Sequence, residues 1–153
     1  MNKEFMQEAI KEAKIAALNN EVPVGAVIVK DGKIIAKGRN MREEKQNALS
    51  HAEIEAINNA CKILNSWRLD DCEMYVTLEP CTMCAGAIIN SRIKKVYVGT
   101  RDEKTGAVGS VLNLFEDYTF NHKVESETGI LKEECEDILK KFFKELRKIK
   151  NGG

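Results

Sequence analysis

The strongest constraint on the fold of this 153-residue chain is a pair of short motifs, His51-Ala-Glu53 and Pro80-Cys81-Thr-Met-Cys84. Imidazole nitrogen and thiolate sulfur are preferred ligands of zinc, which protein side chains surround as a tetrahedron. His51, Cys81 and Cys84 therefore predict a zinc site, and any fold must bring the two motifs to one point. Three protein ligands leave the fourth position to water, which is typical of a catalytic rather than a structural zinc site.

The remaining cysteines and the second histidine do not complete a structural site. Cys61, Cys72, Cys135 and His122 form no second C-x-x-C or C-x-x-H pair with the motif residues. We expect these three cysteines to be packing residues with reduced thiols. Glu53 supplies the base that a catalytic zinc site needs.

Each motif alone has a simpler interpretation. An H-x-E triplet occurs often by chance, and a C-x-x-C pair can be a redox pair. The redox interpretation would leave Glu53 of the upstream motif without a role. The two motifs together, each at a predicted turn into a helix, favour a catalytic metal site.

The residues around the first motif indicate how it is presented. Ser50 precedes a stretch, Ala52 to Leu64, in which apolar residues recur with helical spacing. Ser50 is therefore expected to cap this helix, with His51 and Glu53 in its first turn.

The second motif follows the same order of elements. Met74 to Leu78 predicts a strand, Pro80 ends it, and Cys81 opens an apolar helix from Met83 to Ile89. A helix N-terminus carries unpaired backbone N–H groups, which stabilise thiolates. If water at this site attacks an unsaturated carbon of a substrate, a tetrahedral intermediate with a negatively charged oxygen forms. The backbone N–H of Cys81 is a candidate hydrogen-bond donor to that oxygen.

The rest of the chain predicts a single α/β domain over residues 1–153. We expect a helix over residues 3–19, a hairpin of strands 24–29 and 33–37 turned at Asp31-Gly32, strands over 95–98 and 123–127, and a last helix over 132–148. Strands that alternate with helices indicate a layered domain with a mixed sheet, its hairpin antiparallel and its later strands parallel. Residues 151–153 are expected to fray.

Charge and hydropathy limit the possible partners. The formal net charge is zero, which by itself indicates no nucleic-acid partner. The basic residues from Lys140 to Lys150 suit RNA contact, but they suit the dipole of the last helix equally well. The apolar stretch Val22 to Val29 is too short to span a bilayer, and residues 1–20 lack the apolar core of a signal peptide. We therefore expect a cytoplasmic protein with no membrane association.

Longer stretches resemble the bacterial tRNA adenosine deaminase family, TadA, of the cytidine deaminase-like superfamily. The combination of H-x-E and P-C-x-x-C is a signature of zinc deaminases of nucleobases. The stretches typical of TadA itself are D-x-K-T-G-A-x-G-S at residues 102–110, Asn121-His122 and Phe142-Phe143. The wider likeness covers residues 21–29, 38–40, 51–54, 75–88, 91–93, 129–131 and 134–135.

The resemblance implies a three-layer α/β/α cytidine deaminase-like domain with a central mixed five-stranded sheet. It implies a homodimer that uses zinc to convert adenosine hydrolytically to inosine at the wobble position of a tRNA anticodon. His51, Cys81 and Cys84 would be the metal ligands. Glu53 would move protons from water to the ring nitrogen and to the departing ammonia.

The resemblance also assigns substrate contacts. Asn40 would hold the target nucleotide, Val24 and Pro23 would wall the base, Asp102 and Lys104 would lie beside the nucleotide, and Phe142, Phe143 and Arg147 would meet flanking anticodon bases. Each position has a structural alternative. Asn40 suits a turn, Val24 a core strand, Asp102 a solvated loop, and the phenylalanines the packing of the last helix.

Two other functions remain open from the sequence. A guanine, cytosine or nucleotide deaminase of the same superfamily would have the same hydrolytic site. A non-catalytic, zinc-stabilised RNA-binding module would keep His51 and both cysteines but would not need Glu53.

Overall fold

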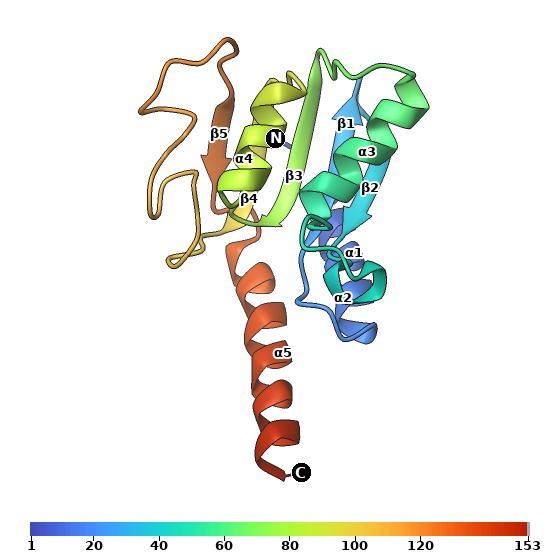
Figure 1. The fold of residues 1–153 in the computed structure, drawn as a ribbon, viewed down its shortest axis with the longest axis vertical. Coiled ribbons are helices and arrows are strands. Elements are labelled where there is room, and N and C mark those ends of the chain that lie inside the picture. Colours follow the sequence, from blue (N-terminus) through green and yellow to red (C-terminus); the bar gives the residue numbers. More distant parts are fainter. Residues whose placement is uncertain (153) are drawn as a thin grey trace.

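The computed structural model describes residues 1–152 and contains a five-stranded sheet between two layers of helices (Figure 1). The elements are α1 (Lys3–Leu18), β1 (Gly25–Lys30), β2 (Lys33–Arg39), α2 (Arg42–Lys45), α3 (Ala52–Leu64), β3 (Cys72–Leu78), α4 (Thr82–Asn90), β4 (Lys95–Thr100), β5 (Glu125–Thr128) and α5 (Lys132–Gly152). The strand order is β2-β1-β3-β4-β5. β1 runs antiparallel to β2 and β3, whereas β3, β4 and β5 are parallel. The expected three-layer fold with a mixed five-stranded sheet is confirmed.

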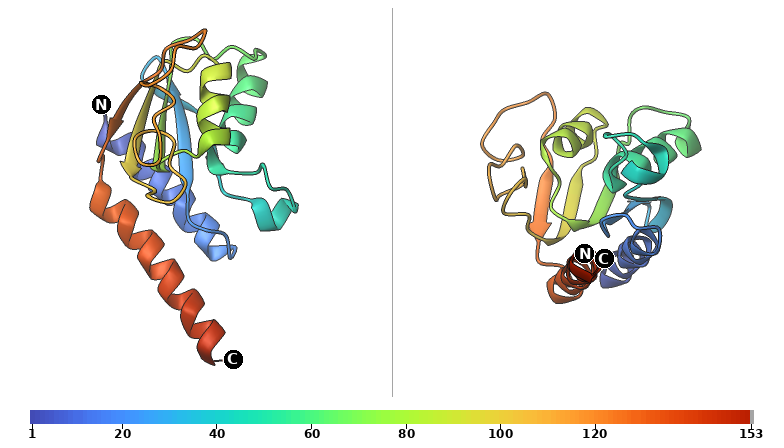
Figure 2. Two further views of the ribbon diagram at one scale, coloured as in Figure 1. Left: turned by 60° about the vertical axis from the view of Figure 1, so that its left-hand side comes forward. Right: turned by 60° about the horizontal axis from the view of Figure 1, so that its bottom comes forward.

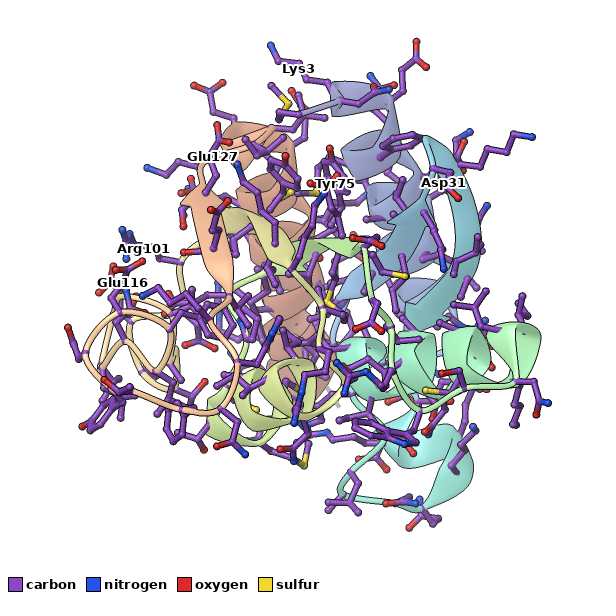
Figure 3. All side chains as sticks on the ribbon, turned by 90° about the horizontal axis from the view of Figure 1, so that it is seen from above. Lys3, Asp31, Tyr75, Arg101, Glu116 and Glu127 are labelled. Carbon is purple, nitrogen blue, oxygen red and sulfur yellow. The ribbon has the colours of Figure 1, made fainter. Side chains whose placement is uncertain are left out.

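Alternation along the strands supplies the two faces of the sheet. Ile28 and Met74 point to the layer of α3 and α4, while Val27 and Tyr75 point to the layer of α1 and α5. Figure 2 shows the two helix pairs on opposite faces of the sheet. Tyr75 stacks on Tyr97 with ring centroids 4.4 Å apart, and Figure 3 shows Tyr75 between α1 and α5. Each face therefore has its own apolar core.

Two glycines allow helices to lie close to the sheet. A Cβ on Gly38 of β2 would be 2.4 Å from both the carbonyl oxygen of Ala52 and the backbone nitrogen of Ala56. A Cβ on Gly25 of β1 would meet the backbone of α1 in the same way. Gly38 therefore sets the depth at which the first turn of α3 lies against β2.

The predicted start of α3 was wrong by one residue. His51, not Ser50, is the N-cap of α3. The backbone of Ser50 is already used, because its N–H donates to the carbonyl of Asn47 and its own carbonyl accepts from the N–H of Met41. The short helix α2, which precedes the segment from Asn47 to Ser50, was not predicted.

Other boundaries of helices and strands also differ from the predicted ones, by up to four residues. β3 begins at Cys72 rather than Met74, and the last strand lies at residues 125–128 rather than 123–127. α5 extends past the predicted end at residue 148, so Asn151 is helical rather than frayed, and residue 153 lies outside the described residues. Within residues 1–152, no helix has both the length and the apolar character needed to cross a membrane.

The cysteines outside the motifs are packing residues, as predicted, whereas the last helix was predicted only in part. All five cysteines are free thiols. Cys72 and Cys135 are buried, and the half-buried Cys61 packs against the core on the α3 and α4 side of the sheet. The apolar face of α5 packs only near its start. Cys135 is 1% exposed, whereas Leu146 is 48% and Ile149 73% exposed. The expectation that one broad face of α5 is buried was wrong for its second half.

Candidate active site

The two motifs meet where α3 and α4 begin, at the lower edge of the sheet in Figure 1. His51 is the N-cap of α3 and Cys81 is the N-cap of α4, and both have extended backbone conformations. The carbonyl of His51 accepts from the N–H of Glu55, and the carbonyl of Cys81 accepts from the N–H of Ala85. Neither side chain makes a capping hydrogen bond. Both side chains are therefore available for another task.

The three expected ligands are grouped around one point. One donor atom each from His51, Cys81 and Cys84 lies within 4.8 Å of the other two. Nδ1 of His51 is 3.7 Å from Sγ of Cys81 and 3.5 Å from Sγ of Cys84. A tetrahedral zinc with ordinary bond lengths separates nitrogen and sulfur ligands by about 3.6 Å. The donor set therefore fits a metal ion, held through Nδ1 of the histidine.

The two thiols and the imidazole lie within hydrogen-bonding distance of one another and shift each other's pKa. Hydrogen bonding from Cys84 and His51 lowers the pKa of Cys81 to about 4, while the pKa of Cys84 is raised, chiefly by the same contact with Cys81. The hydrogen bond to Cys81 raises the pKa of His51. Zinc binds thiolates and neutral imidazole, so its binding would release the protons that these three side chains carry.

Glu53 lies beside this cluster but is not part of it. Among the described residues the cluster contains only His51, Cys81 and Cys84. The carboxyl group of Glu53, 4% exposed, lines the same cavity as His51. Burial raises the pKa of Glu53 to about 7. A carboxyl group with a pKa near neutral can both take up and release a proton, as a general acid and base must.

The cluster opens into a cavity of about 260 Å³. Its lining residues come from five segments: Val22, Val24, Asn40, Arg42, His51, Ala52, Glu53, Leu78, Glu79, Cys81, Asp102 and Thr105. Pockets for drug-sized ligands usually occupy roughly 300–1,000 Å³. The smaller volume suits one flat ring system rather than a whole extended ligand.

The first group of expected substrate residues lies at this cavity, with one exception. Val24 and Asn40 line it, but Pro23 is buried and its neighbour Val22 forms the wall instead. The side-chain amide of Asn40 donates to the carbonyl of Val22, and its side-chain oxygen accepts from the N–H of Arg42. Asn40 is thus fixed in orientation, as a turn residue that also borders the cavity.

Asp102 also lines the cavity, but its carboxylate is turned toward its own loop. It accepts from the N–H groups of Lys104 and Thr105 and, at 2.7 Å, from the hydroxyl of Thr105. Lys104 does not line the cavity. The backbone turn around Asp102 therefore places Thr105, which the sequence did not indicate, at the cavity.

The remaining expected residues lie on α5 or, for Lys104, beside it. Lys104, Phe143 and Arg147 line a surface groove of about 560 Å³, the α5 groove, together with Leu139, Lys140, Leu146 and Lys150. Phe142 does not line this groove, although its ring contacts that of Phe143 edge to face, with centroids 5.4 Å apart. The structure thus separates the expected substrate residues into a cavity group and a groove group. Adjacent helical positions point in different directions, so only one phenylalanine lines the groove.

Two buried carboxylates at the site were missed by the sequence analysis. Glu21, 1% exposed, accepts from the N–H groups of Glu43 and Glu44 at the start of α2. Glu79, 3% exposed, accepts hydrogen bonds from Asp102, Val108 and Ser110. An acid placed directly between an apolar strand and the Pro80-Cys81 turn was the only sequence signal for Glu79.

The comparisons with known proteins agree with this geometry. A family model described as MafB19-like deaminase matches residues 1–147. A tRNA-specific adenosine deaminase of Bacillus subtilis is 51% identical over 146 residues, which cover 95% of this chain and 91% of that protein.

Two solved structures show the same fold. One comes from studies of A-to-I editing by tRNA:A34 deaminases at the wobble position; it has a TM-score of 0.87 and 43% identity, and the match covers 90% of this chain and all of that chain. The other, a guanine deaminase from Bacillus subtilis, has a TM-score of 0.62 and 34% identity, over 79% of this chain and 88% of that one. The chain therefore belongs to the MafB19-like deaminases and, among them, to the family of the tRNA-specific adenosine deaminases.

Proposed function

We propose that this protein is a zinc-dependent tRNA adenosine deaminase that hydrolyses adenosine to inosine at the wobble position of an anticodon. The observation that carries the chemistry is the three-atom donor cluster with a buried carboxylate beside it, at the end of a small cavity. The support for a tRNA substrate is the 51% identity to a tRNA-specific adenosine deaminase over 95% of the chain.

His51, Cys81 and Cys84 would hold the zinc ion. When bound, zinc supplies Lewis acidity that makes water a nucleophile near neutral pH. Glu53 accepts a proton from the attacking water and delivers protons to the ring nitrogen and to the leaving amine. The C6–O bond forms first and gives a tetrahedral intermediate; the C6–N bond then breaks, so water is consumed and ammonia released. The backbone N–H of Cys81, at the N-terminus of α4, donates to the oxygen that becomes negative.

The cavity group would bind the nucleotide and the groove group the neighbouring bases. Val24 borders the base, and Asn40 offers the polar atoms of a fixed amide. Pro23 acts through the turn that places Val22 at the wall. A base must leave its stack to enter a cavity of this size, which suits an anticodon loop with unstacked bases. Phe143 and Arg147 in the α5 groove would contact flanking bases and phosphates, with Lys104 beside them.

The substitution Glu53→Gln tests the catalytic role. It keeps the size of the side chain and removes proton transfer. We expect ammonia release from an anticodon stem-loop to fall by at least about 100-fold, since general acid–base catalysis contributes ~10²–10⁴-fold. Zinc content and thermal stability are expected to stay close to those of the wild type. Activity within about tenfold of wild type would reject the proton-transfer role and leave the RNA-binding module as the alternative.

A substrate comparison tests the function against the guanine or cytosine deaminase alternative, which the 34% identity to a guanine deaminase supports. The enzyme is incubated with an adenosine-containing anticodon stem-loop and, separately, with free adenine, guanine and cytosine. We expect inosine in the RNA and no ammonia from the free bases. Turnover of guanine with the RNA unchanged would establish the alternative.

The assembly and location are proposed on the same basis. We propose a homodimer in the cytoplasm, where free thiols such as those of this chain remain reduced. Sedimentation analysis is expected to give twice the mass of the chain at micromolar concentration. A monomer throughout the concentration series would remove the dimer from the proposal.

A further inference from the structure

Glu79 joins the ligand-bearing turn to a second segment of the site. It follows β3 and precedes Pro80-Cys81, and it is 3% exposed. Its carboxylate accepts four hydrogen bonds, all from the segment 102–110, here called the Asp102 loop. The donors are the N–H of Asp102 at 3.1 Å, the N–H of Val108 at 2.9 Å, the N–H of Ser110 at 3.1 Å and the hydroxyl of Ser110 at 2.5 Å.

The Asp102 loop closes tightly around this carboxylate. A Cβ on Gly106 would lie 2.3 Å from the carboxyl carbon of Glu79 and 2.5 Å from the carbonyl oxygen of Asp102. The backbone also holds the loop, because the N–H of Ala107 donates to the carbonyl of Pro80 at 2.8 Å. The conformation of the loop therefore depends on a buried anion whose hydrogen-bond partners are backbone N–H groups and one hydroxyl.

The held loop forms one wall of the cavity. Asp102 and Thr105 line it, and the side chain of Asp102 fixes Thr105 through two hydrogen bonds. The backbone of Asp102 is in turn held by Glu79. A continuous series of hydrogen bonds thus runs from Glu79 to the residue at the cavity wall.

We propose that Glu79 is a positioning residue: it holds the Asp102 loop against the cavity and thereby determines how tightly the substrate nucleotide is bound. The inference rests on the proposed function, because the nucleotide is the ligand whose binding it sets. Glu79 takes no part in proton transfer, which belongs to Glu53. Its loss should therefore change substrate affinity far more than the rate of the chemical step.

The substitution Glu79→Gln tests this role. A glutamine keeps one acceptor but turns an N–H₂ donor toward a group of donors. With the anticodon stem-loop as substrate, we expect KM to rise about 10- to 100-fold, as for loss of hydrogen bonds to a charged group. We expect kcat to stay within about threefold and zinc content to stay unchanged. A fall in kcat at constant KM, or loss of zinc, would assign Glu79 to the ligand turn and overturn the inference.

Two further variants make the test graded. Ser110→Ala removes one of the four donors and leaves the carboxylate in place, so we expect KM to rise only about threefold. Glu73→Gln is the matched control, because Glu73 lies on β3, the strand that Glu79 follows, but does not line the active-site cavity; its kinetics should equal those of wild type. Thr105→Ala should raise KM by a smaller factor in the Glu79→Gln background than in the wild type, since both substitutions loosen the same wall of the cavity. Additive effects would contradict the proposed coupling.

Hydrogen exchange separates failure of this inference from failure of the proposed function. The amides of Asp102, Val108 and Ser110 are bonded to Glu79. Glu79→Gln should speed their exchange at least about tenfold while α3 and α4 exchange as in the wild type. Unchanged exchange in the Asp102 loop would overturn the inference whatever the substrate. Failure of the wild-type enzyme to deaminate the stem-loop would instead contradict the proposed function.

Discussion

The second half of α5 and the first turn of α3 differ in how they are held to the rest of the molecule. The first turn of α3 lies against β2 at the distance allowed by Gly38, and its N-cap carries a ligand of the proposed metal. α5 packs on β4 and α1 near its start and then leaves the body of the protein (Figure 2). Leu146 and Ile149 remain exposed there. Groups that perform chemistry need fixed positions, whereas a surface for a large flexible substrate does not.

Among the substitutions that test this comparison, those of the proposed metal ligands should have the largest effect. Cys84 is buried and lies 3.5 Å from Nδ1 of His51. Substitution of residues that only hydrogen-bond to a metal ligand already lowers metal affinity or activity about 10- to 100-fold. We therefore expect Cys84→Ser to reduce deamination by more than about 100-fold and to lower zinc content, both measured on the purified protein.

The control is Cys61→Ser, a half-buried thiol outside the cluster. It is expected to keep zinc and activity. Treatment of the wild type with a chelator should abolish activity and lower Tm, with recovery when zinc is added back. Full activity after complete metal removal would contradict the metal site itself.

The next largest effect is expected from a substitution that changes the distance between α3 and β2. Gly38→Ala places a methyl group within 2.4 Å of backbone atoms of α3, and backbone cannot be relieved by a side-chain rotation. We expect the free energy of unfolding to fall by about 3 kcal/mol, at the upper end of overpacking effects. Because α3 carries His51 and Glu53, kcat should fall as well. Urea unfolding and steady-state kinetics measure both.

Gly86→Ala is the matched control, because Gly86 lies within α4 and, apart from its chain neighbours and the backbone of its own helix, no atom lies within 4 Å of the added Cβ. Alanine is about 1 kcal/mol more favourable than glycine in a helix interior. The control should therefore be neutral or stabilising. Equal stability of both variants would show that α3 can move away from β2 without cost.

The sequence predicted what depends on local chemistry and missed what depends on distant partners. His51, Cys81 and Cys84 were found because ligand type and helix start are both local properties, and the structure brings them together. The pattern of α5 predicted an apolar face correctly, but burial of that face depends on what lies opposite. Leu146 lies on this face and is 48% exposed.

The missed contacts share the same cause. Helix α2 has four residues and no buried side chain, so no apolar period reveals it. Glu79 looks like any acid before a turn until the Asp102 loop, 23 residues further on, folds onto it. The residue patterns alone predicted five strands, and the resemblance to a known family supplied their arrangement in a three-layer fold.

The smallest expected effect is at the free half of α5. Arg147 lines the α5 groove with Phe143, whereas its neighbour Lys148 does not line it. Both are exposed, so substitution by alanine should change the free energy of unfolding by no more than about 0.5 kcal/mol. We expect Arg147→Ala to weaken binding of the stem-loop about threefold and to reduce the salt dependence of binding by about one counterion.

Lys148→Ala carries the same loss of charge on the same helix, and this makes it a direct control for position. If the groove binds RNA, Lys148→Ala should weaken binding less than Arg147→Ala at every salt concentration, because a charge outside the groove contributes only to the long-range field. Equal losses would mean that α5 attracts RNA through its net charge alone. In that case Phe143→Ala, which removes a ring from the groove without altering charge, should leave affinity unchanged rather than lower it.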